Sequence, residues 1–414
     1  MSIQSTTQNI QQFTDSMKKL GVHVSNVKSM GLLLLKYIRG ECLFQDTQTI
    51  FCRGLILDAD NFQPICVPPE KSQKFPYFLQ NIEDWGKVII EEFIDGTMIN
   101  VFFHGGDWHI STRSKIGAKC KWFSDKNFAE MFDEAKGGLD FEKMNPELTY
   151  SFVLRHPENR IVTKYDNADL VLVQVRKGFQ EIDTYEIYEE LKSIGMEFVV
   201  PKRYSHSTLE SVLEQIAEMS YEDQGLVFKA NGVRSKLRND KYNSVKQLRG
   251  NNPNMFYNYI ELRKAKMVTQ YREYFPEQEE QFTNWFDEIK RMTGLLHSCY
   301  VNYFINHSID RDIIPYELRP LCYELHGHHL NSGRKLKIER DYVINYFNSL
   351  PTKKIIFVIN YRKNKDYHES KRLQGGLTAD EIKAQIMSEG SSLETGASVE
   401  GVVASEDGSA DSVE

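Results

Sequence analysis

The chain has 414 residues, of which 41% are hydrophobic and 12% are aromatic. This length is enough for two or three domains with cores of their own, and the composition excludes a wholly disordered chain, which combines low hydrophobicity with high charge. The formal net charge of −7 includes six acidic residues at 391–414, where there is no Lys or Arg, so the remainder is close to neutral.

Neither the cysteines nor the apolar runs point to secretion or to a membrane. The six cysteines are scattered, with no C-x-x-C pair and no Cys/His spacing typical of zinc ligands. The leucine-rich run from Gly31 to Tyr37 is far too short to span a bilayer. A local histidine group is more typical of a surface or a helix end than of a metal site, because no third ligand is in view: His326, His328 and His329. We therefore predict a soluble, cytoplasmic protein.

The predicted elements change in character along the chain. Residues 8–23 have helical spacing, and short alternating or apolar runs between about 31 and 240 predict strands, interrupted by helices at 183–194 and 208–219. This mixture predicts an α+β domain of antiparallel sheets with flanking helices over 1–250. Helical spacing returns in three further stretches, at 255–271, 277–303 and 340–350. We predict a mainly helical domain over 251–375 and a largely disordered acidic tail over 376–414.

Two basic regions suggest contacts with phosphate. Six Lys or Arg residues lie between Arg234 and Arg249, which could face phosphates or form a solvated face of a helix or strand. A second basic run, from Lys353 to Arg372, suits either nucleic acid or a contact with the acidic tail.

The stretch IIEEFIDGTMINVFF carries the most informative pattern, a strand that runs into Asp95-Gly96 and out into a second strand. An Asp-Gly step alone is a turn signal. It becomes more informative because further short motifs accompany it in a fixed order along the chain: Arg53-Gly54, Lys74-Phe75, Thr112-Arg113, Pro157 to Val162, Gln224 to Lys229 and Ser235 to Arg238.

In these motifs the sequence resembles the covalent nucleotidyltransferase superfamily, and within it the phage type of ATP-dependent RNA ligase. The resemblance covers about 31–250 and, more weakly, the helical part. It implies a pocket that holds a nucleotide or an RNA end, ATP and Mg²⁺ as cofactors, and a viral or phage source, hence host cytoplasm. The positions that match as nucleotide- or phosphate-binding are Arg53, Lys74, Asp95, Gly96, Asn159, Arg160, Gly225, Lys229, Lys236 and Arg238.

Three departures remove chemistry that the family needs. The nucleophilic lysine of the family's Lys-x-Asp-Gly motif is replaced by Phe93, and a phenyl ring has no lone pair with which to attack phosphorus. Two carboxylates that the family places near the ribose and the metal are replaced by Val153 and Gln224. Since Mg²⁺ prefers charged oxygen ligands, these changes leave metal and ATP use open.

Two other lysines could replace the missing nucleophile. Lys87 lies six residues before Phe93, about 20 Å along an extended strand, which places it out of reach. Lys115, on a neighbouring strand, is better placed but is also typical of an exposed strand lysine. Without the lysine, Asp95 could serve only the turn.

The leading hypothesis is a protein related to RNA ligases that binds nucleotide or RNA ends without adenylylating itself. The alternatives are an active ATP-dependent RNA ligase that uses another lysine, and an interaction protein on a degenerate ligase fold. The sequence leaves the oligomeric state and any protein partner open. Strand alternation predicts that Phe93 and Asp95 share a strand face, with Phe93 in a cleft between two antiparallel sheets and close to Lys236.

Overall fold

The computed structural model describes residues 3–42, 44, 49–196 and 198–375, without the side chains at 3–8 and 368–375. The predicted acidic tail at 376–414 lies outside these residues. The chain forms two compact units, which divide between Gln247 and Leu248 and are taken separately below. In the described part of the chain, no helix is both long and apolar enough to cross a membrane.

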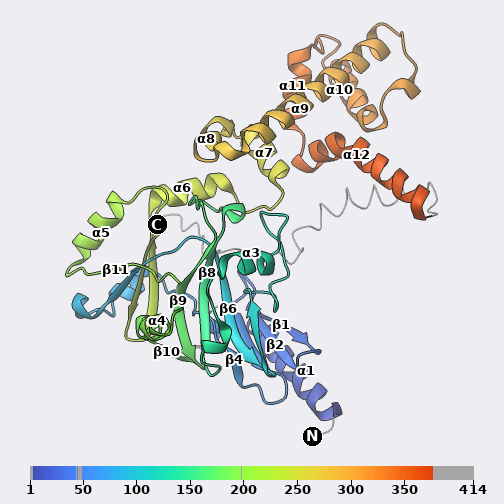
Figure 1. Ribbon diagram of the computed structural model, residues 1–414. Helices are drawn as coiled ribbons and strands as arrows, with labels where there is room; N and C mark the ends of the chain where they lie inside the picture. The colour runs from blue at the N-terminus through green and yellow to red at the C-terminus, as the bar shows by residue number, and fades with distance from the viewer. Residues whose placement is uncertain (1–2, 43, 45–48, 197, 376–414) are drawn as a thin grey trace. The chain divides into compact units, whose positions relative to one another are not determined.

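Three sheets, paired antiparallel throughout, make up the first unit, which confirms the predicted α+β class (Figure 1). The first has the order β1-β2-β3-β4, with bounds Val22–Val27, Leu32–Tyr37, Arg53–Asp58 and Pro64–Cys66. The second has the order β10-β9-β8-β6-β7, with bounds Gln180–Ile182, Asp169–Lys177, Thr149–Arg155, Thr97–His104 and Asp107–Ser111. The third has the order β11-β5-β12-β13, with bounds Arg203–Tyr204, Ile89–Glu92, Gly225–Ala230 and Val233–Arg238.

Each sheet has its own apolar core and its own helices. Helix α1 (Ile3–Lys19) packs Phe13 and Met17 against the first sheet. The second sheet packs against α3 (Phe128–Ala135), whose capping box at Asn127 fixes its start, and against α4 (Thr184–Ser193). The third packs its outer face against α2 (Phe75–Leu79) and α5 (Leu209–Glu218). The helices cover the outer faces of the second and third sheets. The remaining faces of these two sheets lie towards each other.

The described residues of the second unit form helices joined by loops and contain no strand. Its helices are α7 (Met255–Lys264), α8 (Val268–Tyr274), α9 (Glu279–Tyr300), α10 (Arg319–Asn331), α11 (Arg340–Ser349) and α12 (Thr352–Gly375). Helix α9 continues into a π-helical turn at Val301–Ile305. Helix α6 (Asp240–Arg249) contains the last residues of the first unit.

Several predicted boundaries are corrected. The first helix ends at Lys19, because Gly21 has a positive φ of 72° and strand β1 follows at once. The helix predicted over 255–271 is two helices, since Lys266 takes a positive φ of 60° between α7 and α8. Helices α2, α3, α10 and α12 were not predicted, and α6 lies where the prediction left helix and strand open.

Candidate functional site

A pocket lies between the facing sides of the second and third sheets. It encloses about 1010 Å³ of empty space when the part open to solvent is counted. Its floor is apolar and includes Ile94, Met98, Val153, Val173 and Val227. Five cationic side chains and two carboxylates line it as well: Arg53, Arg113, Arg234, Lys236, Arg238, Glu91 and Glu92.

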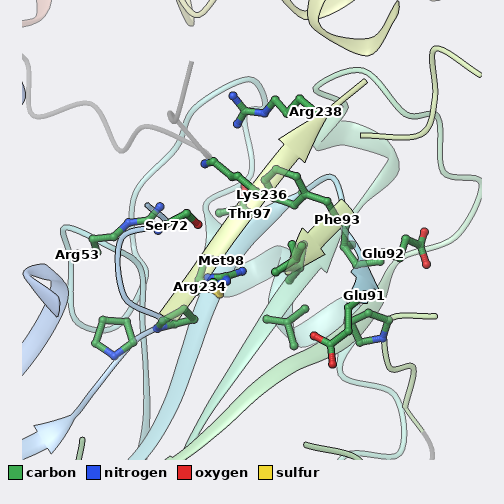
Figure 2. Close-up of a pocket in the computed structure, with 18 of the residues that line it drawn as sticks. Arg53, Ser72, Glu91, Glu92, Phe93, Thr97, Met98, Arg234, Lys236 and Arg238 are labelled. Carbon is green, nitrogen blue, oxygen red and sulfur yellow. The ribbon is translucent and has the colours of Figure 1, made fainter. Parts of the chain in front are cut away.

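Phe93 belongs to a row of residues that crosses the third sheet. Its backbone N–H donates to the Gly225 carbonyl at 3.0 Å, and Gly225 pairs with Arg238 on β13. The neighbouring row of the same face joins Val227 to Lys236. The Phe93 ring lies 5.4 Å from Lys236 Nζ and 5.5 Å from Arg238 Cζ, measured to the ring centroid (Figure 2). The predicted position of Phe93, in a cleft and beside Lys236, is confirmed.

Three arginines extend the positive charge of the pocket. Arg53 donates to the Glu70 carbonyl at 3.5 Å, and Arg113 stacks on Tyr37 with its Cζ 4.3 Å from the ring centroid. Burial is the main cause of a lowered pKa of Arg234, to which the charge of Arg53 adds while Glu70 opposes it. A guanidinium nevertheless stays protonated in proteins, so it keeps its charge for an anion. Arg113 belongs to the Thr112-Arg113 step of the motif series but was given no role, and Arg234 belongs to the basic region predicted to face phosphates. On its strand, Arg234 alternates with Lys236 and Arg238.

Glu91 is held by ion pairs at the pocket wall. It is 3% exposed, and its carboxylate lies 3.0 Å from Lys229 Nζ and 3.3 Å from Arg203 Nε. Lys229 also lies 3.1 Å from Glu181. Burial opposes the charge of Glu181, but Lys229 outweighs it, and the pKa of Glu181 is lowered. Lys229, predicted as a ligand contact, therefore neutralises carboxylates and is not among the residues that line the pocket.

Asp95 is an anchor and does not line the pocket. One carboxylate oxygen accepts hydrogen bonds from the backbone N–H groups of Val162 and Thr163 at 3.1 and 3.0 Å. The other accepts a hydrogen bond from the Tyr242 hydroxyl at 2.7 Å. Burial, followed by the charge of Asp95, raises the pKa of Tyr242. The expectation that Phe93 and Asp95 share a strand face is wrong, because β5 ends at Glu92 and the alternation stops there.

Gly96 allows the chain to pass close to β8. Its φ is +148°, and a Cβ atom there would lie 2.5 Å from the Leu154 carbonyl oxygen and 2.7 Å from Val153 Cγ1. Val153 itself packs with Ile94 in a small apolar cluster. The position where the resemblance implies a carboxylate is therefore part of a close apolar contact.

The remaining predicted residues lie off the pocket wall. Lys74 is exposed at the start of α2, and Arg160 donates through Nε to the Val162 carbonyl at 2.9 Å. Gln224 is 2% exposed, and its side-chain amide has no hydrogen-bond partner among the described residues. Asn159 supports the wall indirectly, because its Nδ2 donates to Oγ1 of Thr97, a lining residue, at 2.8 Å.

Of the lysines in the described chain, Lys236 alone lines the pocket. Neither alternative nucleophile is placed there. The side chain of Lys87 is 84% exposed and lies 3.9 Å from Asp84, and Lys115 is also exposed.

The polar groups of the pocket suit phosphate better than a metal ion bound by protein alone. No group of three or more His, Cys, Asp or Glu side chains within the described residues could hold a metal. Glu91 is already paired, which leaves Glu92 as the lining carboxylate without an ion pair in the described part of the structure. Mg²⁺ commonly binds through one or two carboxylates together with substrate phosphates, so a metal would have to arrive with its nucleotide.

Some of the viral proteins to which this chain is similar are named as RNA ligases. No family model matches the chain. The predicted resemblance to RNA ligases is confirmed by relatives of that name in viruses.

A protein of Autographa californica nuclear polyhedrosis virus, named as a bifunctional polynucleotide kinase/RNA ligase, is 27% identical over 258 residues, 57% of this chain and 36% of its own. An African swine fever virus protein named as an RNA ligase is 25% identical over 154 residues, 30% of this chain and 33% of its own. An invertebrate iridescent virus 3 homologue of immediate-early protein ICP-46 is 22% identical over 245 residues, 56% of this chain and 52% of its own. The matches thus span a third to a half of these relatives.

Among solved structures, a protein named as an ATP-dependent DNA ligase of Aquifex aeolicus has a TM-score of 0.43 at 16% identity, covering 68% of this chain and 79% of its own. An archaeal ATP-dependent RNA ligase has a TM-score of 0.43 at 14% identity, covering 63% and 68%.

Proposed function

We propose that this protein, similar to RNA ligases, binds a nucleotide or a phosphorylated RNA end in the pocket without forming a covalent adenylate at position 93. The observation that carries this proposal is the Phe93 ring beside the cations of Lys236 and Arg238, because the resemblance to RNA ligases implies a nucleophilic lysine at position 93. The phenyl ring of Phe93 has no nitrogen, so it cannot form the phosphoramidate bond that links AMP to a lysine side chain.

The retained cations support binding. Arginine offers two parallel donors to a phosphate, and lysine adds a point charge, so the five cations of the pocket provide a strong anion site. ATP would place its phosphates among these groups and its base against the apolar floor. Bound Mg²⁺ would neutralise phosphate charge, with Glu92 as its protein ligand.

A second candidate is an active ATP-dependent RNA ligase in which Lys236 carries the AMP. One observation favours it, since Lys236 lines the pocket beside position 93. The same groups would then serve catalysis as well as binding.

Incubation of the full chain with α-labelled ATP and Mg²⁺ separates these two candidates. The proposed function predicts no label on the protein after denaturation. A stable adduct that maps by mass spectrometry to Lys236, and is lost in Lys236→Arg, would replace it with the active ligase. Binding of 5′-phosphorylated RNA and of ATP is measured in parallel, because an interaction protein would bind neither.

Restoring the lysine alone is not expected to restore adenylylation. In Phe93→Lys the ammonium would face Lys236 and Arg238, while Val153 still supplies an apolar contact in place of a carboxylate. Phe93→Lys with Val153→Glu and Gln224→Glu supplies the missing groups, but it buries charge at two positions that are now 5% and 2% exposed, so this variant is expected to be less stable.

Labelling with α-labelled ATP tests both variants, with Phe93→Met as the matched control for loss of the ring. Efficient adenylylation by Phe93→Lys alone would mean that the nucleophile is the single missing part.

A further inference from the structure

Lys229 lies behind the pocket wall, between two carboxylates. Its Nζ atom is 3.0 Å from Glu91 Oε2 and 3.1 Å from Glu181 Oε1. Glu91 lines the pocket, whereas Lys229 does not. The residue opposite Lys229 on β13 is Arg234, which also lines the pocket. Lys229 is therefore next to the space for a ligand, and its charge is directed at a carboxylate of the pocket wall.

Each of these two carboxylates has a second cation. Glu91 Oε1 lies 3.3 Å from Arg203 Nε. Glu181 Oε2 lies 3.5 Å from Arg176 Nη2. Arg176 also pairs with Glu70, in the loop between β4 and α2, where two prolines and a serine line the pocket. A row of alternating charges thus runs from β11 to this loop, with the lysine at its centre. Because each carboxylate has an arginine as well, loss of the lysine alone still leaves both carboxylates with a cation.

We propose that Lys229 is a positioning residue, which holds Glu91 at the wall and compensates its charge, and so sets the affinity of the pocket for anions without touching the ligand. This inference rests on the proposed function, because it assumes that the pocket binds phosphate. Charges interact more strongly at a partly buried site than in bulk water, because the effective dielectric constant is lower. A wall carboxylate whose charge is less compensated therefore repels a phosphate.

The direction of two single changes separates this role from a purely structural one. If Lys229 acts through charge, removal of its ammonium weakens anion binding, and removal of the Glu91 charge strengthens it. If the ion pair only keeps the wall in shape, both changes weaken binding. The combination of the two changes restores the charge balance, so it should recover the affinity only in the first case.

Calorimetric titration of the full chain with inorganic pyrophosphate at low salt measures these effects. We expect Lys229→Met to bind pyrophosphate about ten-fold more weakly than the unmodified chain. Glu91→Gln should bind it about three-fold more tightly, because the lysine then adds net positive charge beside the pocket. In this second variant the remaining cations keep partners, since Arg203 is 3.0 Å from Asp183 and Lys229 is 3.1 Å from Glu181. The double variant should return to within a factor of about two of the unmodified chain.

Lys177→Met is the matched control. Lys177 ends β9 and forms an exposed ion pair with Glu147, so its loss should change the affinity by less than a factor of about two. Denaturation followed by tryptophan fluorescence shows whether each variant is folded. If Lys229→Met does not fold, the direction of the change in Glu91→Gln decides the question alone.

Weaker or unchanged binding of pyrophosphate by Glu91→Gln would overturn the inference and leave the proposed function standing. A folded double variant that binds as weakly as Lys229→Met would do the same, because the loss would then not depend on charge. If the unmodified chain binds neither pyrophosphate nor ATP nor RNA, the proposed function fails, and the inference fails with it.

Discussion

Asp95→Ala should lower the free energy of unfolding of the first unit by about 3–5 kcal/mol, because it leaves buried donors without an acceptor. The carboxylate accepts from Val162, Thr163 and Tyr242, and it is 3% exposed. Three of the four tryptophans, Trp85, Trp108 and Trp122, lie in this unit, so denaturation followed by tryptophan fluorescence measures the loss.

Two further variants separate the contributions at this anchor. Tyr242→Phe removes one of the three hydrogen bonds and should cost about 1–3 kcal/mol. Asp107→Ala, an exposed aspartate in the same unit, is the matched control and should stay within about 0.5 kcal/mol. A loss below about 1 kcal/mol in Asp95→Ala would mean that the carboxylate does not anchor the loop.

The second large effect is expected from Lys236→Ala combined with Arg238→Ala. The two cations lie on the pocket face of β13 at the Phe93 ring, and their loss should weaken binding of ATP or 5′-phosphorylated RNA by about 1–3 kcal/mol. The dependence of affinity on salt should also become shallower, because fewer counterions are released when a phosphate binds. Titration at several salt concentrations measures both effects.

The matched control for this pair is Lys136→Ala with Lys143→Ala. These lysines form surface ion pairs with Asp133 and Asp140 and do not line the pocket. The control should leave affinity within a factor of about two. Unchanged binding in the pocket variant would mean that the cleft is not a phosphate site, and the interaction-protein hypothesis would then take its place.

Alternation along one strand made part of the pocket predictable from sequence. Lys236 and Arg238 are two residues apart on β13, so they share a face, and strand pairing brings that face to Phe93. Arg234 lies two residues before Lys236 on β13 and so shares its face, although it matches no family motif. Its position on the pocket face could have been predicted from this spacing alone.

Asp95 and Lys229 show where the sequence was insufficient. The function of Asp95 depends on the end of β5 and on backbone groups almost seventy positions later, at Val162 and Thr163. The partners of Lys229, Glu91 and Glu181, come from two other strands. Such contacts arise from tertiary packing, which local patterns do not encode. Likewise, Lys266 breaks the helix predicted over 255–271 through a backbone angle that lysine rarely adopts.

The anchor formed by Asp95 and Gly96 bears on how related sequences are interpreted. Its contacts run to the loop at Val162 and to Tyr242, and none of them involves the side chain at position 93. A lineage could therefore lose its nucleophile while these hydrogen bonds remain. The Asp-Gly step would then indicate that the fold is retained, without indicating the activity. On the proposed function, the residue three places before that glycine is the better indicator, in genome surveys, of whether a ligase-like gene encodes a self-adenylylating enzyme.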